Sequence, residues 1–307
     1  MSIALPRGLP AQRTLIAEGV EVLSGDELHR WGRRPLRLCL VNLMPNKIVT
    51  ETQIARLLGA TSMMVELTLC VPDSYRSKTA PADHMASFYR PWTHVRDEHF
   101  DGLIVTGAPV EALPFEDVIY WSDLCAIFDW ARARPISSLY ICWAAQAALY
   151  HFYGIPKHRL PEKMFGVFRH RVTNNDSHLL RGFGDEFPAP VSRHTEVRAA
   201  DLPAQAGLTA LAVSADAGLC VLEDRGNRAA YMFNHLEYDT GTLGEEFVRD
   251  RLAGKPVGIP CNYFPDDDPE RSPANVWRAY GYLLFANWLA LMHRTAWPRT
   301  SDESLIQ

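Results

Sequence analysis

The amino-acid sequence predicts an α/β protein with a parallel β-sheet and helices on both faces. Two observations carry this prediction. From residue 35 onward, short apolar segments with the pattern of buried strands alternate with segments of helical periodicity. Within residues 139–148, an apolar strand pattern changes into a helical pattern in a single turn. Such abrupt strand–helix junctions are typical of α/β enzymes.

The first half of the pattern predicts three strands and one helix. Residues 36–43 form a nearly continuous apolar run, as expected for a strand that is buried on both faces. Apolar residues then recur on one helical face across residues 50–58, and residues 64–71 give a second strand pattern. Residues 102–105 predict a third strand, which ends in the turn 106–109. This turn should therefore lie at the carboxyl edge of the sheet, where α/β proteins bind ligands.

The second half begins with a helical pattern over residues 121–134, which leads into the strand that ends before Cys142. Residues 166–233 are richer in strand patterns and less regular, and residues 276–292 predict a final helix. Prolines and charges make the N-terminal segment irregular, so we expect an arm there. The predicted organisation is an arm at 1–34, one α/β domain at 35–298 and a C-terminal tail at 299–307.

Composition excludes several classes of function. The hydrophobic share of 47% and the charged share of 22% are ordinary for a globular protein. A net charge of −5 leaves no basic footprint, so we expect no nucleic-acid partner. No apolar run reaches the ~18 residues of a membrane helix and no signal core is present, so we expect no membrane association and a cytoplasmic location. The six cysteines form no CxxC pair, which favours reduced thiols and predicts no metal site.

Cys142 is the candidate nucleophile, because it stands at the junction between strand and helix patterns. A lone cysteine in an apolar strand is more often a core residue. The sharp turn, however, exposes the sulfur to the N–H groups that begin a helix, and these favour the thiolate. The backbone N–H of Trp143 is one expected oxyanion donor, and the Gly107–Ala108 turn, which should share a cleft with Cys142, is the expected source of a second.

His235 and Glu237 are the candidate base and its supporting carboxylate. Residues 230–234 read as a strand that ends immediately before His235. Residues two apart on an extended chain project to the same side. Glu237 can therefore hold one ring nitrogen of His235 while the other faces the sulfur. Cys142, His235 and Glu237 together supply the nucleophile, the base and the orienting carboxylate that acyl transfer needs.

These residues belong to a longer series of motifs that resembles the homoserine O-acyltransferases of methionine biosynthesis. That family has a class I glutamine-amidotransferase-like, or flavodoxin-like, fold. The resemblance runs in order from about residue 35 to 290, although this chain has Asn234 and Leu236 where many relatives have Gly and Pro. The matching stretches are 42–47 with 50–51, 106–109, 142–147, 153–157, 162–163, 192–193, 235–239, 249–250 and 262–265.

The resemblance implies a ping-pong acyltransferase. Cys142 would take the acyl group from acetyl-CoA, a co-substrate rather than a bound cofactor, and L-homoserine would accept it. His235 would be the proton acceptor, supported by Glu237. The substrate-contacting positions of the family fall on Lys163, Ser192 and Arg249, residue types that suit an amino acid. A homodimer is also expected from the family.

Glu111 occupies the position that the family associates with the choice of acyl donor. A succinyl group ends in a carboxylate, and two carboxylates about 4 Å apart repel by on the order of 4 kcal/mol at an effective dielectric near 20. Half of that energy would already disfavour succinyl-CoA by more than about tenfold. Glu111 also fills space that a four-carbon group needs. We therefore expect acetyl transfer.

Four alternatives stay open at this point. Within the family, the chain could be a homoserine O-succinyltransferase, or a serine O-acetyltransferase, because one methylene changes binding by only ~1–3 kcal/mol. A cysteine hydrolase or glutamine amidotransferase would be expected to have glycine on both sides of the nucleophile, whereas Ile141 and Trp143 flank Cys142 here. A non-catalytic thiol sensor would need neither His235 nor Glu237.

Overall fold

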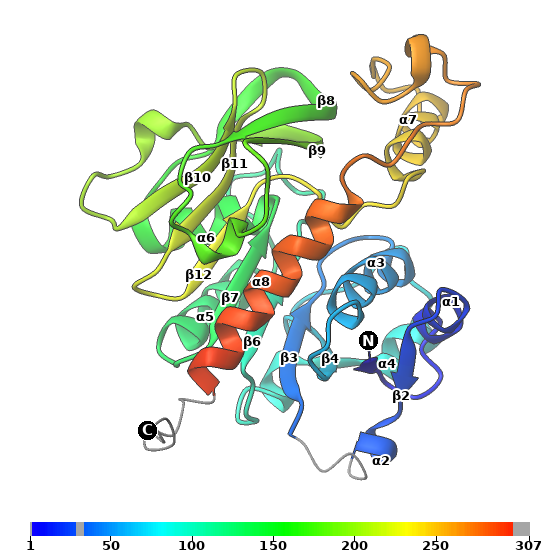
Figure 1. The fold of residues 1–307 in the computed structure, drawn as a ribbon, viewed down its shortest axis with the longest axis vertical. Helices are drawn as coiled ribbons and strands as arrows, with labels where there is room; N and C mark the ends of the chain where they lie inside the picture. Colours follow the sequence, from blue (N-terminus) through cyan, green and yellow to red (C-terminus); the bar gives the residue numbers. More distant parts are fainter. Residues whose placement is uncertain (1, 29–33, 297–307) are drawn as a thin grey trace, which may run out of the picture.

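The computed structural model describes residues 2–28 and 34–296, and within these ranges the strands form one mixed 12-stranded sheet (Figure 1). The strand order is β2-β1-β4-β3-β6-β7-β12-β11-β10-β8-β9, and β5 pairs with β4. The strands are β1 (Ser2–Ala4), β2 (Glu21–Leu23), β3 (Leu36–Val41), β4 (Val65–Val71), β5 (Tyr89–Pro91), β6 (Gly102–Val105), β7 (Ser137–Ile141), β8 (His158–Val172), β9 (Glu186–Glu196), β10 (Leu208–Ser214), β11 (Gly218–Asp224) and β12 (Ala229–Met232). The helices are α1 (Ala11–Ala17), α2 (Gly25–Leu28), α3 (Lys47–Gly59), α4 (Ala82–Phe88), α5 (Trp121–Arg132), α6 (Trp143–Tyr153), α7 (Thr242–Leu252) and α8 (Arg278–Ala296).

The sheet has a parallel half and an antiparallel half. Strands β4, β3, β6, β7 and β12 are parallel neighbours. From β12 onward, β11, β10, β8 and β9 pair antiparallel. The antiparallel half accounts for the irregular strand pattern predicted for residues 166–233, because hairpins with one exposed face alternate less regularly than buried parallel strands. The predicted α/β fold with a largely parallel sheet is confirmed.

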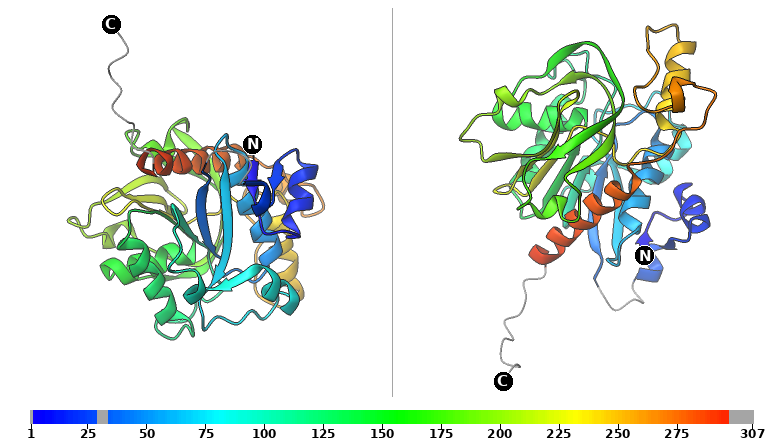
Figure 2. Two further views of the ribbon diagram at one scale, coloured as in Figure 1. Left: turned by 90° about the horizontal axis from the view of Figure 1, so that it is seen from below. Right: turned by 45° about the horizontal axis from the view of Figure 1, so that its top comes forward.

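Helices cover both faces of the parallel half (Figure 2). Alternate residues of β3 point to opposite faces, as in any strand. Leu38 and Leu40 belong to the core that includes apolar residues of α3 and α8. Cys39 and Val41 belong to a second core that includes residues of α5 and α6. The sheet therefore separates two hydrophobic layers, and its buried strands bring the loops at their carboxyl ends together.

The N-terminal segment corrects one prediction. Residues 2–28 do not form an irregular arm, because β1 pairs parallel with β4 and β2 pairs parallel with β1. The strand β1 has only three residues, and all of them are buried. A strand this short gives no periodic signal in the sequence. Residues 29–33 and 297–307, including the predicted C-terminal tail at 299–307, lie outside the described residues.

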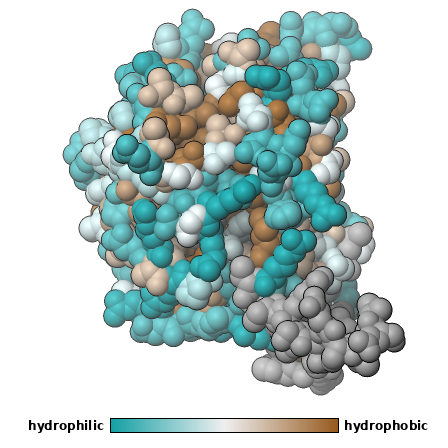
Figure 3. Space-filling model, turned by 60° about the vertical axis from the view of Figure 1, so that its left-hand side comes forward, coloured by the Kyte–Doolittle hydropathy of each residue, from teal (hydrophilic) through white to brown (hydrophobic). Residues whose placement is uncertain are grey.

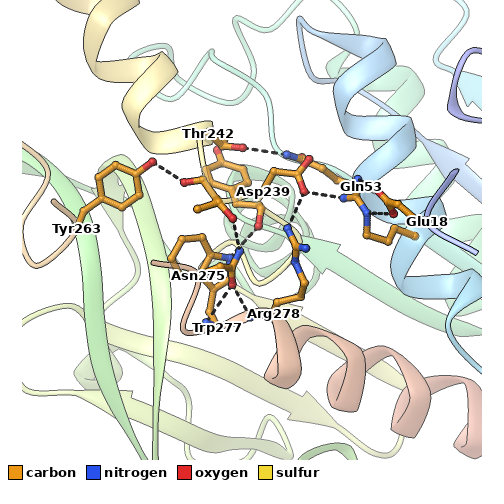
Figure 4. A network of polar contacts seen from close by, with 11 residues as sticks. Glu18, Gln53, Asp239, Thr242, Tyr263, Asn275, Trp277 and Arg278 are labelled. Atoms are coloured by element: carbon orange, nitrogen blue, oxygen red, sulfur yellow. Dashed lines mark hydrogen bonds and ion pairs between the residues drawn. The ribbon is translucent and has the colours of Figure 1, made fainter. Parts of the chain in front are cut away.

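Polar contacts fix the segment between β12 and α7 to the rest of the molecule (Figure 4). Asp239 accepts hydrogen bonds from Arg56 on α3, at 2.6 Å, and from Arg278 on α8, at 3.3 Å. Arg56 also forms two hydrogen bonds with Glu18, at 2.6 and 2.8 Å. Gln53 donates to Thr242 at the start of α7, at 3.0 Å. These contacts hold the start of α7 against α3 and α8.

We expect Arg56→Met to lower the free energy of unfolding by about 1–3 kcal/mol, because it leaves two carboxylates without a buried donor. Arg56 is only 7% exposed. Arg278→Met is the matched control: its side chain is 42% exposed, so its loss should cost about 1 kcal/mol or less. Urea unfolding of both variants measures the difference. Equal losses for the two variants would contradict this account of the network.

The described helices include none long and apolar enough to cross a membrane. On the face of the molecule shown in Figure 3, hydrophilic side chains predominate, and apolar ones gather mainly in its upper part. Most of the large apolar side chains instead lie in the two cores on either side of the sheet.

Candidate active site

Cys142 occupies the junction between β7 and α6, as the sequence predicts. Its φ of 54° and ψ of −115° are uncommon for a residue with a Cβ atom and mark a strained turn, a feature of exposed nucleophiles in α/β enzymes. The turn is held by the Cys142 N–H, which donates to the Met232 carbonyl at 2.7 Å. It is also held by the Ala145 N–H, which donates to the Cys142 carbonyl at 3.1 Å. The sulfur is thus presented at the start of a helix.

The turn after β6 lies directly against this cysteine. A Cβ atom added at Gly107 would stand 3.2 Å from Cβ and 3.7 Å from Sγ of Cys142. The preceding Thr106 fixes the turn through its side chain, which accepts a hydrogen bond from the Leu43 N–H at 2.8 Å. A side chain at Gly107 would crowd Cβ of Cys142, so glycine favours this close approach. The structure brings the carboxyl ends of β6 and β7 together, so both contribute to one cleft.

His235 and Glu237 follow β12, the neighbour of β7 in the sheet. The Nδ1 atom of His235 lies 2.6 Å from Oε1 of Glu237, and both side chains are buried. The backbone N–H of His235 donates to the Pro190 carbonyl at 2.9 Å. The ring of Tyr238 stacks on the imidazole with 4.2 Å between ring centroids and 15° between planes. Carboxylate, backbone and stacked ring therefore fix the orientation of the imidazole.

Opposing effects act on the protonation of His235. Burial lowers its pKa, but the negative charges of Glu237 and Cys142, together with hydrogen bonds to both groups, raise the pKa well above its ordinary value. Glu237 binds Nδ1 of the ring, and Cys142 is the second group that acts on the imidazole. A cysteine beside a histidine that a carboxylate orients is the arrangement of a nucleophile activated by a base.

Asn234, one of the two departures noted above, joins a buried polar chain behind the histidine. Its side-chain carbonyl accepts from Arg193 at 2.6 Å, and its amide lies 2.8 Å from Nε2 of His170. Burial and the charge of Arg193 lower the pKa of His170 to about 4, so the neutral ring can accept this bond. Asn234 thus ties the residue before His235 to β8 and β9.

The candidate residues converge on a cleft of about 610 Å³ between the carboxyl edge of the sheet, the β8–β9 ribbon and α7. Glu237 does not line this cleft, since it lies behind His235. The remaining predicted site residues all do, and they are Glu111, Cys142, Lys163, Ser192, His235 and Arg249. Among the described residues, no group of three or more His, Cys, Asp or Glu side chains is arranged to hold a metal ion.

Glu246 of α7 is the centre of the hydrogen bonds on one wall of the cleft. Its carboxylate accepts from the hydroxyl of Ser192 at 2.6 Å and from Nζ of Lys163 at 3.3 Å. The Tyr238 hydroxyl donates to its other oxygen at 3.0 Å. The wall thus contains a largely buried carboxylate that three donors surround, next to the predicted Ser192 and Lys163.

Arg249 lies one helical turn further along α7, but its guanidinium is already paired. Its Nε and one terminal nitrogen donate to Oδ1 of Asp250 at 3.1 and 3.0 Å. Lys163 and Lys255 also donate to Asp250, each at 3.2 Å. Burial raises the pKa of Asp250, but these cations, Lys163 above all, outweigh it and lower the pKa. The wall therefore presents cations and carboxylates side by side, and the cations are in the majority.

Glu111 lies in the loop that follows the Gly107 turn, and Lys157, just before β8, is bound to this loop. The Lys157 ammonium donates to the backbone carbonyls of Glu111, at 2.9 Å, and Leu113. It also lies over the ring of Phe115, 4.3 Å from the ring centroid. Glu111 and Lys157 both line the cleft, so opposite charges occur in the same loop region beside the nucleophile.

Comparison with known proteins identifies the family of the chain. A family model described as homoserine O-succinyltransferase matches residues 2–298. The chain belongs to the homoserine O-succinyltransferase family. The predicted resemblance is thereby confirmed, and the match covers the N-terminal strands as well as the α/β core. Members of this family are acyltransferases, so an acyl-CoA co-substrate is expected of the chain.

Curated relatives of this family align over nearly the whole chain. A homoserine O-acetyltransferase of Rhizorhabdus wittichii is 54% identical over 295 residues, which are 96% of this chain and 92% of that protein. A homoserine O-acetyltransferase of Hyphomonas neptunium is 50% identical and covers 99% of both chains. A homoserine O-acetyltransferase of Brucella canis is 52% identical and covers 96% of both.

Solved structures show the same fold at low identity. A glutamine amidotransferase from Thermotoga maritima superimposes with a TM-score of 0.56 at 14% identity, over 85% of this chain and 99% of that chain. A glutamine amidotransferase from Methylobacillus flagellatus gives 0.52 at 13% identity, over 83% and 94%. The predicted glutamine-amidotransferase-like fold is confirmed, while identities this low carry no information about substrate.

Three residues of the cleft were not predicted as site residues from the sequence. Glu246, Tyr238 and Lys157 each face the cleft, but a single charged or aromatic residue has no distinctive pattern. Glu246 precedes Arg249 by three residues on α7, so both project from one face of this helix. Tyr238 directly follows Glu237, within the quoted motif 235–239. Lys157 ends the quoted motif 153–157, but this motif does not indicate its contact with a loop more than 40 residues earlier.

Proposed function

We propose that the chain is a homoserine O-acetyltransferase that works through a Cys142 acyl-thioester and serves methionine biosynthesis. One observation carries the proposal: a strained Cys142 interacts with a His235 bonded to Glu237, in a cleft that also contains Glu111. The names of the relatives at 50–54% identity support the same reaction.

In the first half-reaction, the Cys142 thiolate attacks the carbonyl carbon of acetyl-CoA. The backbone N–H of Trp143, at the start of α6, and one from the Gly107–Ala108 turn would stabilise the oxyanion. The position of Gly107 against the sulfur supports this assignment. When the tetrahedral intermediate collapses, the carbon–sulfur bond to CoA breaks, and the imidazolium of His235 supplies the proton for the leaving thiolate.

In the second half-reaction, His235 acts as a base. Acylation removes the negative charge from the Cys142 sulfur, and with it one of the causes that raise the pKa of His235. The neutral imidazole can then take the proton from the hydroxyl of L-homoserine as the oxygen attacks the thioester. Collapse of this second intermediate releases O-acetylhomoserine and restores the thiolate and imidazolium. Glu237 holds the ring in place in both steps.

The wall formed by β8, β9 and α7 supplies groups of both signs for an amino acid. The Glu246 carboxylate, beside Ser192, is suited to the ammonium group of homoserine. Arg249 and Lys163 are suited to its carboxylate. Because Asp250 already binds one edge of Arg249, a substrate carboxylate would use the remaining N–H groups rather than a free guanidinium fork.

Glu111 supports acetyl-CoA as the donor, although the family model takes its name from succinyl transfer. Its carboxylate repels the distal carboxylate of a succinyl group by the Coulomb argument given above. We also propose that residues 35–298 form one α/β domain, whose sheet is extended beyond β4 by β1 and β2 of the N-terminal segment. The homodimer and the cytoplasmic location stay predictions.

The test is intact-protein mass spectrometry after brief exposure to acetyl-CoA or succinyl-CoA without acceptor. We expect the addition of one acetyl group, its removal by L-homoserine, and slower removal by L-serine. A succinyl adduct would retain the mechanism and overturn the donor assignment. Preferential removal by serine would overturn the acceptor, and the absence of any adduct would overturn thioester chemistry.

A further inference from the structure

Lys157 is a cation in the donor region of the cleft that the proposed mechanism does not use. It is half-buried just before β8, and its ammonium reaches across to the loop that contains Glu111. Two of its three N–H groups are accounted for by the carbonyls of Glu111 and Leu113. The third donor is not bound to any described residue, and the side chain lines the cleft.

The charge of Lys157 is incompletely balanced. Among the described residues, no carboxylate lies within ion-pair distance of Nζ, and the two bound groups are neutral carbonyls. Burial lowers the pKa of Lys157, while the more distant carboxylates of Glu111 and Glu116 act in the opposite direction. Of the two carboxylates, Glu111 does more to offset the cost of burying the Lys157 charge at the cleft.

We propose that Lys157 is a second donor-specificity residue, whose ammonium is able to pair with the distal carboxylate of a dicarboxylic acyl group and is kept from doing so by Glu111. This inference rests on the proposed function, since it concerns the acyl-CoA half-reaction. Glu111 then acts in two ways. Its carboxylate repels a second carboxylate, and its negative charge partly neutralises Lys157, the cation that is bound to its own loop.

A steric role of Glu111 and an effect of its charge on Lys157 predict different results. If Glu111 only filled space, its replacement by glycine would admit any four-carbon acyl group. If the replacement also frees the charge of Lys157 to pair with a substrate, it favours an acidic four-carbon group over a neutral one. Succinyl-CoA and butyryl-CoA form this comparison, because both acyl chains have four carbons and only succinyl carries a terminal carboxylate.

The experiment compares initial rates of thioester formation on Cys142 with succinyl-CoA and butyryl-CoA, followed by intact mass. In Glu111→Gly, we expect the succinyl-to-butyryl ratio to rise by about tenfold or more over the unsubstituted protein. In the double variant Glu111→Gly with Lys157→Gln, the ratio should fall by about tenfold. Glutamine keeps an N–H donor and removes the charge, with a side chain one atom shorter.

Two controls make the result specific. Lys78→Gln, added to Glu111→Gly, makes the same chemical change at an exposed lysine that does not line the cleft, and the ratio should stay as in Glu111→Gly. Lys157→Arg, added instead, keeps a cation and should keep most of the preference. Two outcomes overturn the role of Lys157. One is a succinyl-to-butyryl ratio that Lys157→Gln leaves unchanged, and the other is a ratio that falls as far in Lys157→Arg as in Lys157→Gln.

Acetyl-CoA distinguishes this inference from the proposed function. If the unsubstituted protein forms the acetyl-thioester while Lys157→Gln leaves the succinyl-to-butyryl ratio of Glu111→Gly unchanged, the function stands and the inference fails. If the unsubstituted protein forms no thioester with any of the three donors, the function fails and the inference fails with it.

Discussion

Replacing Cys142 by alanine is expected to abolish acyl transfer, with kcat/KM lower by ~10⁴-fold or more. The reason is that both half-reactions pass through the sulfur: without it no thioester forms, and His235 has no nucleophile to activate. The replacement keeps Cβ and removes only Sγ, so β7 and α6 should remain folded around it. Release of CoA in the presence of both substrates gives the overall rate, and intact mass gives the thioester.

Cys261→Ser is the matched control, because Cys261 is an exposed cysteine that does not line the cleft. This variant should form the thioester at the rate of the unsubstituted protein. Far-UV circular dichroism and thermal unfolding establish that Cys142→Ala is folded. Substantial turnover by a folded Cys142→Ala protein would rule out covalent catalysis at this residue.

Replacing Glu237 by glutamine is expected to slow the second half-reaction by ~10³-fold and to move its pH dependence. The negative charge of Glu237 is one of the groups that raise the pKa of His235. The base must be neutral to accept a proton, so the rate of deacylation rises with pH through the pKa of His235. Loss of the charge lowers that pKa, and the rising limb should therefore move to lower pH. The plateau rate falls because glutamine holds the ring less firmly and leaves the imidazolium uncompensated.

The measurement is the single-turnover rate at which L-homoserine removes the acetyl group, across a range of pH. Glu237→Asp separates the two effects: it keeps the charge but shortens the side chain, so the plateau should fall while the midpoint moves less. A midpoint that stays in place in Glu237→Gln would show that the Glu237 charge does not control the protonation of His235.

The nucleophile could be predicted from the sequence because its signal is local. A buried strand that turns into a helix at Cys142 is visible in ten consecutive residues, and the junction in the structure begins where the pattern changes. His235 and Glu237 gave a weaker signal, since a strand pattern and a spacing of two recur elsewhere. Their assignment gained support from the motifs that the chain shares with the acyltransferases.

Lys163, Ser192 and Arg249 could be assigned only by family resemblance. Each is an ordinary polar residue in its own segment, and nothing in the sequence shows that β8, β9 and α7 face one another. The structure shows in addition that Arg249 is partly occupied by Asp250 and that Glu246 connects the other two. These facts depend on side-chain directions across three elements, which no local pattern encodes.

The sequence by itself determined the α/β class, the parallel core and the position of the nucleophile. Hydrophobic periodicity and a strand–helix junction are local features, which residues close together in the sequence reveal. Only the tertiary structure decided that the N-terminal segment extends the sheet, that Glu246 belongs to the cleft, and that Lys157 is bound to the loop of Glu111. Each of these depends on pairing between distant segments, and its energy comes from contacts that exist only after the chain has folded.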